Sequence, residues 1–158
     1  MTFVFDSDIL STFAKIGKLN ILKKISGNGE LLIPPAVISE LKSSKSILLQ
    51  DILHSKIFKN ISLDAQESNF AKNVDFQRRL GKGEIECIAV CKFRNAILAT
   101  NDARAISVAE KLNIIVADLE TILYSLKELI SKKQLRQIIN DIEAKDNVMI
   151  VNKKEILS

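Results

Sequence analysis

The sequence predicts an α/β fold, a three-layer α/β/α sandwich around a mainly parallel sheet of four to five strands. Short apolar runs such as Phe3-Val4-Phe5 and Ile114-Ile115-Val116 have the length and composition of buried strands. Amphipathic segments with helical spacing separate these runs, and that alternation is typical of a parallel sheet with helices on both faces. Right-handed crossovers would then bring the carboxyl ends of all strands to one edge of the sheet.

A single domain over residues 1–158 is expected, because 158 residues suit one hydrophobic core and no repeat, linker or low-complexity tract interrupts them. Hydrophobic residues make up 47% and charged residues 27%, which excludes a disordered chain. A net charge of +4 permits a polyanionic partner without requiring one. The first residues lack the basic region of a signal peptide and no apolar run reaches the roughly 20 residues of a membrane span, so we expect a cytoplasmic protein with no membrane partner.

The only cysteines, Cys87 and Cys91, are four residues apart in one predicted helix. They make no disulfide framework, and buried structural thiols in a reducing cytoplasm are expected. Half a zinc site is the alternative, but the sequence has no second cysteine pair and only one histidine, His54.

In the first half of the chain, apolar periodicity and turn residues predict three strands and four helices. The strands are residues 3–6, 31–33 and a short one within 57–63, and the helices are 9–25, one opened by Pro34-Pro35 and interrupted at Ser43-Ser44, 46–55 and 64–80. Asp64 is a fitting N-cap for the last of these helices, where Glu67 completes a capping box.

In the second half, Gly81-Lys82-Gly83 breaks the chain before a helix over 84–93 that is apolar nearly all round, which indicates a central position. The other expected elements are a strand at 96–100, a helix at 103–111, a strand at 114–116, and helices at 119–129 and 135–142. The apolar tail Val148-Met149-Ile150-Val151 either adds an edge strand, completes the core or contacts a partner.

Four acidic residues are expected to meet at the carboxyl edge of the sheet. Asp6 and Asp102 follow apolar strands directly, where α/β sheets place their ligand sites. Glu40 lies one to two turns into the helix entered from the strand at 31–33, and Glu84 begins the central helix. Elements from both halves of the sequence can thus bring the four carboxylates together.

Each of these acids also has a simpler role open to it. Asp6 and Asp102 can N-cap the helices that follow them, and Glu84 can complement a helix N-terminus. Glu40 can be a solvated helix residue. These separate roles do not explain why all four fall at one edge. Gathered carboxylates repel one another and their pKa values rise unless a cation holds them, and oxygen ligands suit Mg²⁺ or Mn²⁺.

Four segments in this order carry a resemblance to a known family. They are Phe5–Leu10, Ile33–Leu41, Gly81–Ala89 and Ala99–Arg104. Over residues 3–129 the chain resembles the PIN-domain ribonucleases, which include the VapC-type toxins. The resemblance implies a PIN-like nuclease domain, a Mg²⁺- or Mn²⁺-dependent hydrolase that cuts phosphodiester bonds of single-stranded or structured RNA.

By position, Asp6, Glu40, Glu84 and Asp102 match the acidic catalytic residues of that family, with Asp6, Asp102 and Glu84 as the metal ligands. Ser7 or Asp8 matches a polar position beside the first acid. Asp118 is either a fifth acid or a helix cap.

The third acid is either Glu84 or Glu86. These two residues point about 200° apart on a helix, so only one of them can face the site. We favour Glu84, because it lies at the helix start, where free N–H groups favour anions. For Glu86, deeper in the helix, a solvent-facing position is the alternative to the site.

The basic residues placed for RNA contacts are Arg104, Lys82, Lys42 and the pair Arg78-Arg79. For each lysine taken alone a solvated surface position is the favoured interpretation, whereas Arg104 is the exception because it lies two residues past Asp102. The resemblance also implies either a small antitoxin partner or a homodimer. The RNA target, and a toxin role as against RNA processing, stay open at this point.

Two other functions fit parts of the sequence. Asp6-Ser7-Asp8 resembles the Asp-x-Asp of haloacid-dehalogenase-type phosphatases, with Asp6 as nucleophile and Asp8 as acid. That family expects a Gly-Thr or similar pair next, where this chain has Ile9-Leu10. The other alternative is a non-catalytic module that binds RNA or protein, and retention of all four acids argues against it.

Overall fold

The computed structural model describes residues 1–73 and 79–158 of the protein. Within them, five parallel strands form one sheet in the order β3-β2-β1-β4-β5. The strands are β1 (Phe3–Phe5), β2 (Leu31–Ile33), β3 (Lys59–Asn60), β4 (Ile97–Ala99) and β5 (Val116–Ala117). The predicted parallel sheet of four to five strands is confirmed.

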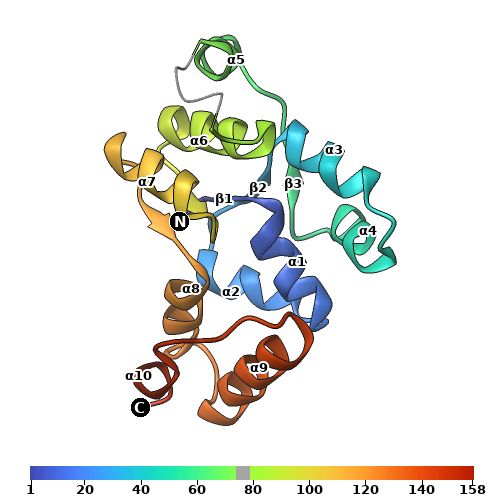
Figure 1. Ribbon diagram of the computed structural model, residues 1–158, viewed down its shortest axis with the longest axis vertical. Coiled ribbons are helices and arrows are strands. Elements are labelled where there is room, and N and C mark those ends of the chain that lie inside the picture. Colours follow the sequence, from blue (N-terminus) through green and yellow to red (C-terminus); the bar gives the residue numbers. More distant parts are fainter. Residues whose placement is uncertain (74–78) are drawn as a thin grey trace.

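Helices cover both faces of this sheet (Figure 1). They are α1 (Ser7–Lys15), α2 (Leu22–Ser26), α3 (Pro35–Ser43), α4 (Ile47–His54), α5 (Ala65–Lys72), α6 (Lys82–Arg94), α7 (Ala103–Lys111), α8 (Leu119–Leu126), α9 (Lys132–Lys145) and α10 (Lys153–Ile156). Helices α6 and α7 lie on one side, with α5 packed outside α6, whereas α1, α2, α8 and α9 lie on the other. This is the three-layer arrangement that the alternation of strands and helices predicts.

Strand β1 occupies the centre of the sheet. Its register with β2 and β4 determines where these strands end at the carboxyl edge of the sheet. Phe3 pairs with Leu31 of β2 and with Ile97 of β4, and Phe5 pairs with Ala99. All three residues of β1 are buried, which explains their unbroken apolar character. Strands β1 and β4 therefore end level with each other, and the residues that follow them meet.

Helix α6 is central, as its apolar composition predicts. Its residues from Ile85 to Cys91 are all buried. Cys87 and Cys91 are free thiols in this core, which confirms the prediction of structural cysteines. Burial raises the pKa of both thiols, so they stay protonated near neutral pH.

The predicted helix over 9–25 is wrong in its extent. Helix α1 begins at Ser7 and ends at Lys15, and a 3₁₀ turn at Leu19–Ile21 precedes α2. Gly17 has φ 65, a left-handed conformation that ordinary residues adopt only at a cost, and it turns the chain here. The apolar spacing continues through the break, which is why periodicity alone misses it.

Other boundaries also differ from the prediction. Helix α6 begins at Lys82, so the predicted break at Gly81-Lys82-Gly83 lies partly inside the helix. Helix α8 ends three residues earlier and α9 three residues later than predicted. The strand within 57–63 shrinks to β3, whose two residues are exposed at the sheet edge. The strand at 114–116 begins two residues later, at Val116, and ends at Ala117, as β5. The helix over 64–80 ends at Lys72 as α5, although the predicted Asp64–Glu67 capping box is present; residues 74–78 lie outside the described part of the chain.

Only part of the apolar tail joins the core: Ile150 is buried and Val148 partly buried, whereas Met149 and Val151 are exposed. The Val151 N–H donates to Glu120 Oε1 at 2.6 Å, and the Ile150 N–H donates to Glu143 Oε1 at 3.4 Å. Among the described residues the tail adds no strand to the sheet. In the same residues, none of the helices combines the length and the apolar character that crossing a membrane requires.

An ion pair between the buried Glu67 and the exposed Arg94 holds α5 on α6. Glu67 is fully buried, and its two carboxylate oxygens accept from Arg94 Nε at 2.6 Å and Nη2 at 2.9 Å. Arg94 also donates to the Ser62 carbonyl at 2.9 Å, and Glu67 Oε2 accepts the Asp64 N–H. One guanidinium therefore fixes both the start of α5 and the loop before it.

We expect Arg94→Met to lower the free energy of unfolding by about 3 kcal/mol, because it leaves the Glu67 carboxylate buried without its charge partner. Urea denaturation measures this. Lys59→Met is the matched control: it removes the exposed pair of Lys59 with Glu30 and should change stability little. Equal losses in the two variants would contradict this interpretation of the Glu67–Arg94 pair.

Candidate active site

Asp6 lies directly after β1 and is both a helix cap and a buried acid. Its Oδ1 accepts the Ser7 N–H at 2.8 Å as the N-cap of α1, and its Oδ2 accepts the Thr100 hydroxyl at 3.1 Å. Its side chain is only 5% exposed. The cap role and the site role are thus combined in one residue.

The loop after β4 lies beside Asp6. The Asp6 N–H donates to the Ala99 carbonyl at 3.0 Å, which continues the β1–β4 ladder by one residue. Thr100 is fully buried, and its hydroxyl oxygen also accepts the Asp102 N–H at 3.2 Å. The Asn101 N–H donates to Asp8 Oδ2 at 2.8 Å. Asp6, Asp8 and the start of α7 are therefore joined through this loop.

Asp102 is the N-cap of α7. Its Oδ1 accepts the N–H groups of Arg104 and Ala105 at 2.9 and 3.0 Å. Its other oxygen, Oδ2, lies 3.9 Å from Arg104 Nη2. One oxygen of Asp102 is therefore held by the N–H groups of α7, and the other lies near the Arg104 guanidinium.

Glu84 reaches Asp102 from the first turn of α6. Its Oε2 accepts the Gly81 N–H at 2.9 Å in a capping box. Burial raises the pKa of Glu84, and the charge and the hydrogen bond of Asp102 raise it further. These two carboxyl groups interact directly.

Glu40, on α3, joins the group from another side. Its Oε2 accepts the Ser7 hydroxyl at 2.9 Å. Its Oε1 lies so close to Gly83 that a Cβ at that position would be 2.5 Å away. Only glycine lets α6 approach this carboxylate, because any side chain at position 83 would displace it.

Burial and mutual repulsion act on this group together. Burial, followed by the charge of Asp8, raises the pKa of Asp6 to about 7. Burial raises the pKa of Asp8, and the charge of Asp102 adds to the effect. Asp6 also senses Glu84. Asp6, Asp8, Glu84 and Asp102 thus form one electrostatic group that a cation would stabilise.

The donor set fits a hard divalent cation in its chemistry, because it consists of oxygen atoms with no thiolate or imidazole. Over residues 1–73 and 79–158, no three His, Cys, Asp or Glu side chains are grouped closely enough to hold a metal ion by themselves. The carboxylates are neighbours that need water to complete a coordination shell, as Mg²⁺ usually retains.

The solvent-facing alternative for Glu86 is wrong. Glu86 is 6% exposed, and its Oε2 accepts the Ala36 N–H at 2.6 Å. It thereby caps α3, whose N-cap residue Pro34 supplies no side-chain acceptor. A helix opened by two prolines needs an acceptor from elsewhere, and that was the missed signal.

Asp118 serves as a helix cap, the simpler of its two predicted roles. It is the N-cap of α8, and its Oδ1 accepts the Thr121 N–H at 2.8 Å. The neighbouring Leu119 N–H donates to Asn101 Oδ1 at 3.2 Å. Asn101 therefore ties the start of α8 to the loop that also holds Asp8.

The basic residues lie at the surface around this group. The Arg104 side chain is 70% exposed, and Lys42, Lys82 and Arg79 are exposed as well. Arg78 lies outside the described residues. Arg104 stands out because it already contacts an acid of the group.

The sequence prediction missed Thr100. This residue holds Asp6 and the Asp102 N–H with one hydroxyl group. A hydroxyl residue directly after an apolar strand was the available signal. Such a residue can stay buried only if its hydrogen-bonding groups are satisfied.

We expect Asp6→Asn to be more stable than the parent in EDTA at pH 7.5. The folded-state pKa of Asp6, about 7, lies above the ordinary value of 3.8, so ionising it in the folded protein is unfavourable and the parent loses stability as pH rises through 7. Asparagine keeps the cap. The Tm advantage of the variant should shrink as pH falls towards 4.5.

Scanning calorimetry between pH 4.5 and 8 measures this difference. Asp118→Asn replaces another N-cap outside the acidic group and is the control, for which we expect little change. An Asp6→Asn variant that is less stable than the parent at pH 7.5 would mean that the carboxylate stabilises the fold.

The family model DUF3368, described as a PIN domain, matches residues 2–155. Among curated proteins, none matches this sequence.

Two solved structures share the fold. One is a chain of VapBC2 from Rickettsia felis bound to a DNA fragment from its promoter, with TM-score 0.57 and 18% identity over 75% of this chain and 98% of that one. The other is a PilT N-terminus domain protein from the archaeon Sulfolobus solfataricus P2, with TM-score 0.53 and 22% identity over 79% of this chain and 92% of that one. Because the family model spans nearly the whole sequence, the chain belongs to the PIN domain family.

Proposed function

We propose that this protein is a metal-dependent endoribonuclease, with residues 1–158 as a single nuclease domain that acts in the cytoplasm. The observation that carries the proposal is the group of Asp6, Asp8, Glu84 and Asp102 at the carboxyl edge of the sheet, where burial and neighbouring charges raise the pKa values of Asp6, Asp8 and Glu84. Membership in the PIN family adds support, since PIN domains are generally nucleases.

Asp6, Glu84 and Asp102 would hold the cation, Mg²⁺ or Mn²⁺. When bound, such an ion lowers the pKa of a coordinated water and neutralises charge that develops on the phosphate. The chain prepares this site through its own hydrogen bonds. The Thr100 hydroxyl orients Asp6 at Oδ2, and the α7 N–H groups orient Asp102 at Oδ1.

Glu40 would complete the catalytic set from α3. Its Oε2 accepts the Ser7 hydroxyl beside Asp6, and Gly83 leaves its Oε1 room at the start of α6. A carboxylate in this place can accept a proton from an attacking water or orient that water.

Exposed cations would bind the phosphates of the RNA. Arg104 is the best placed, because its guanidinium already lies 3.9 Å from Asp102 Oδ2. Lys82 precedes Glu84 by two residues, and Lys42 follows Glu40 by two. Lowering the salt concentration should strengthen binding through all three.

We further propose that the protein is the toxin of a toxin–antitoxin pair, with a small antitoxin protein as partner. The likeness of its fold to a chain of VapBC2, a complex seen with promoter DNA, supports this role. A homodimer is the other assembly to test, by measuring the mass of the protein alone and with its partner.

The phosphatase alternative loses support. The Gly-Thr or similar pair that the phosphatase family expects after the second acid is absent, since Ile9-Leu10 stands there. The chain also belongs to the PIN family. The non-catalytic binding module remains the alternative that the following experiment decides.

We expect the parent to cleave single-stranded RNA in Mn²⁺ and to stop in EDTA. Asp6→Asn and Asp102→Asn should each lower the cleavage rate at least about 100-fold, because each removes a charged metal ligand while keeping a helix cap. Gel analysis of a labelled oligonucleotide measures this. Asp118→Asn is the control. A parent without Mn²⁺-dependent cleavage would favour the binding module.

Glu84 and Glu86 should differ in the same assay. Glu84→Gln weakens the acidic group and should lower the cleavage rate at least about tenfold. Glu86→Gln should retain most activity, because Glu86 caps α3 and an amide oxygen can accept the same N–H. Loss of activity in Glu86→Gln alone would reverse the assignment of the third acid.

A further inference from the structure

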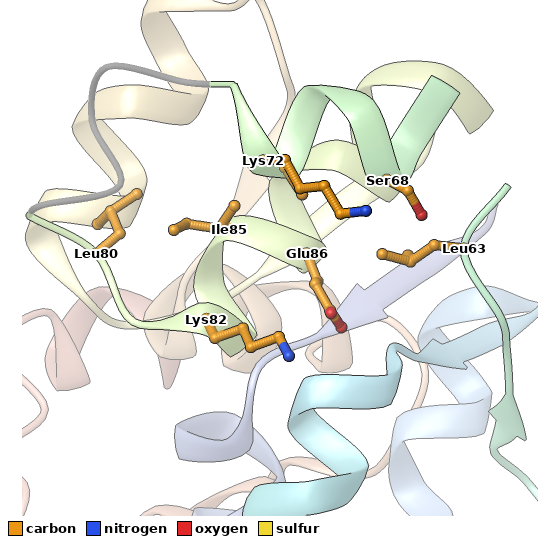
Figure 2. Close-up of a pocket in the computed structure, with 8 residues that line it drawn as sticks. Leu63, Ser68, Lys72, Leu80, Lys82, Ile85 and Glu86 are labelled. Carbon is orange, nitrogen blue, oxygen red and sulfur yellow. The ribbon is translucent and has the colours of Figure 1, made fainter. Parts of the chain in front are cut away.

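A cavity of about 500 Å³ lies beside the first two turns of α6, where α5 and the chain preceding it meet that helix (Figure 2). Leu63, Leu80 and Ile85 line it with apolar surface. Its size and its apolar walls are those of a small-molecule site rather than of a packing defect. None of the acids Asp6, Glu40, Glu84 and Asp102 lines it.

The polar groups of the cavity are few and well placed. Figure 2 shows the Lys72 amine and the Ser68 hydroxyl on one side, and the Glu86 carboxylate and the Lys82 amine on the other. In the described part of the chain, no carboxylate forms an ion pair with either lysine. Two cations and one acid are thus available to a ligand.

The Glu86 carboxylate is held rigidly. Glu86 is only 6% exposed, and its Oε2 is fixed by a hydrogen bond of 2.6 Å from the Ala36 N–H. An ionised carboxylate only accepts hydrogen bonds, so its remaining capacity faces the cavity and requires N–H or O–H donors. Because α3 already orients the Glu86 side chain, a ligand does not have to order that side chain when it binds.

The cavity is adjacent to the acidic group. Lys82, Ile85 and Glu86 line it from the same two turns of α6 that carry Gly83 and Glu84. Gly83 in turn contacts Glu40. A helix is only about 10 Å wide, so a strand with one phosphodiester at the acids reaches the cavity with a nearby nucleotide.

We propose that this cavity is a base-binding subsite for the RNA, selective for guanine. The inference builds on the proposed ribonuclease function and names a specificity determinant for it. Leu63, Leu80 and Ile85 would pack on the faces of the base, and Lys72 and Lys82 would contact phosphates. Glu86 would be a positioning and specificity residue rather than a catalytic one.

Guanine fits because its Watson–Crick edge presents two neighbouring donors, N1–H and the N2 amino group, to one carboxylate. Uracil presents a single N–H between two carbonyl oxygens, which a carboxylate repels. A cationic peptide side chain would also suit Glu86, but Lys72 and Lys82 disfavour it. An acidic peptide would meet the buried carboxylate of Glu86.

Titration of ¹⁵N-labelled protein with GMP and with UMP, without metal, tests this directly. We expect GMP to shift the amide signals of Ser68 and Ile85 and to bind about tenfold more tightly than UMP, the discrimination of one good bidentate contact. Glu86→Gln keeps an acceptor for α3 but turns an amino group towards the base, so the GMP preference should disappear. Glu84→Gln, two residues away, should retain it.

Ser68→Phe provides a second variant that leaves the Glu86–Ala36 contact intact and fills the cavity. It should abolish the GMP shifts at Ile85. Equal affinity for GMP and UMP, shifts confined to the residues around Asp6 and Asp102, or unchanged GMP binding by Ser68→Phe would each overturn the inference.

The two proposals fail in different ways. Base preference in the titration needs no cleavage, so a protein that binds GMP selectively but never cuts RNA contradicts only the ribonuclease function. A protein that cuts RNA in Mn²⁺ but binds GMP and UMP alike contradicts only the guanine subsite. In a randomised RNA, guanine should be enriched near the cut by the parent and not by Glu86→Gln.

Discussion

Confinement of like charges at the carboxyl edge of the sheet is the constraint on which the rest of this structure depends. Buried carboxylates without hydrogen bonds or a charge partner would cost more free energy than a fold of ordinary stability can offset. Here three of the acids are held by N–H groups at helix starts. Asp6 caps α1, Asp102 caps α7 and Glu84 closes the capping box of α6. The positive ends of three helices offset part of the repulsion, and a cation would offset more.

In this arrangement an acidic residue can cap a helix and still offer an oxygen to a cation, so the two roles do not exclude each other. A cap uses only part of an acid's capacity: Asp102 gives Oδ1 to two N–H groups and keeps Oδ2 beside Arg104. Asp118 shows the contrast, because it caps α8 in the same manner without joining the group. Asp118 follows β5 at the edge of the sheet, whereas Asp6 and Asp102 follow the inner strands β1 and β4, and this position rather than capping separates Asp118 from the group.

The sequence predicts most of the fold because strand ends and helix periodicity are local signals. The level ends of β1 and β4, which bring Asp6 beside the Asp102 loop, follow from parallel pairing of two apolar runs. The break at Gly17 and the shortness of β3 could not be predicted from the sequence, because a single left-handed residue or an exposed sheet edge leaves the apolar pattern unchanged.

The site could be predicted in its residue types but not in its long-range hydrogen bonds. Glu86 lies in the same motif as Glu84, and helix geometry shows only that the two diverge. That Glu86 meets the exposed N–H of Ala36 depends on how α3 packs on α6, which no local pattern encodes. The same holds for Thr100, whose partners are 94 and 2 residues away.

The packing of α3 on α6 therefore links the parts of this protein that the sequence presents separately. Gly83 allows the two helices to approach, and this places Glu40 at the acidic group while Glu86 caps α3 from the other side. Glu84 and Glu86 face apart by helix geometry, so one turn of α6 supplies an acid to the candidate active site and another to the neighbouring cavity. A side chain at position 83 would push α6 away from Glu40 or displace that carboxylate. Because α6 carries both Glu84 and Glu86, a shift of the helix would alter the candidate active site and the cavity together, which is a physical reason for glycine at this position.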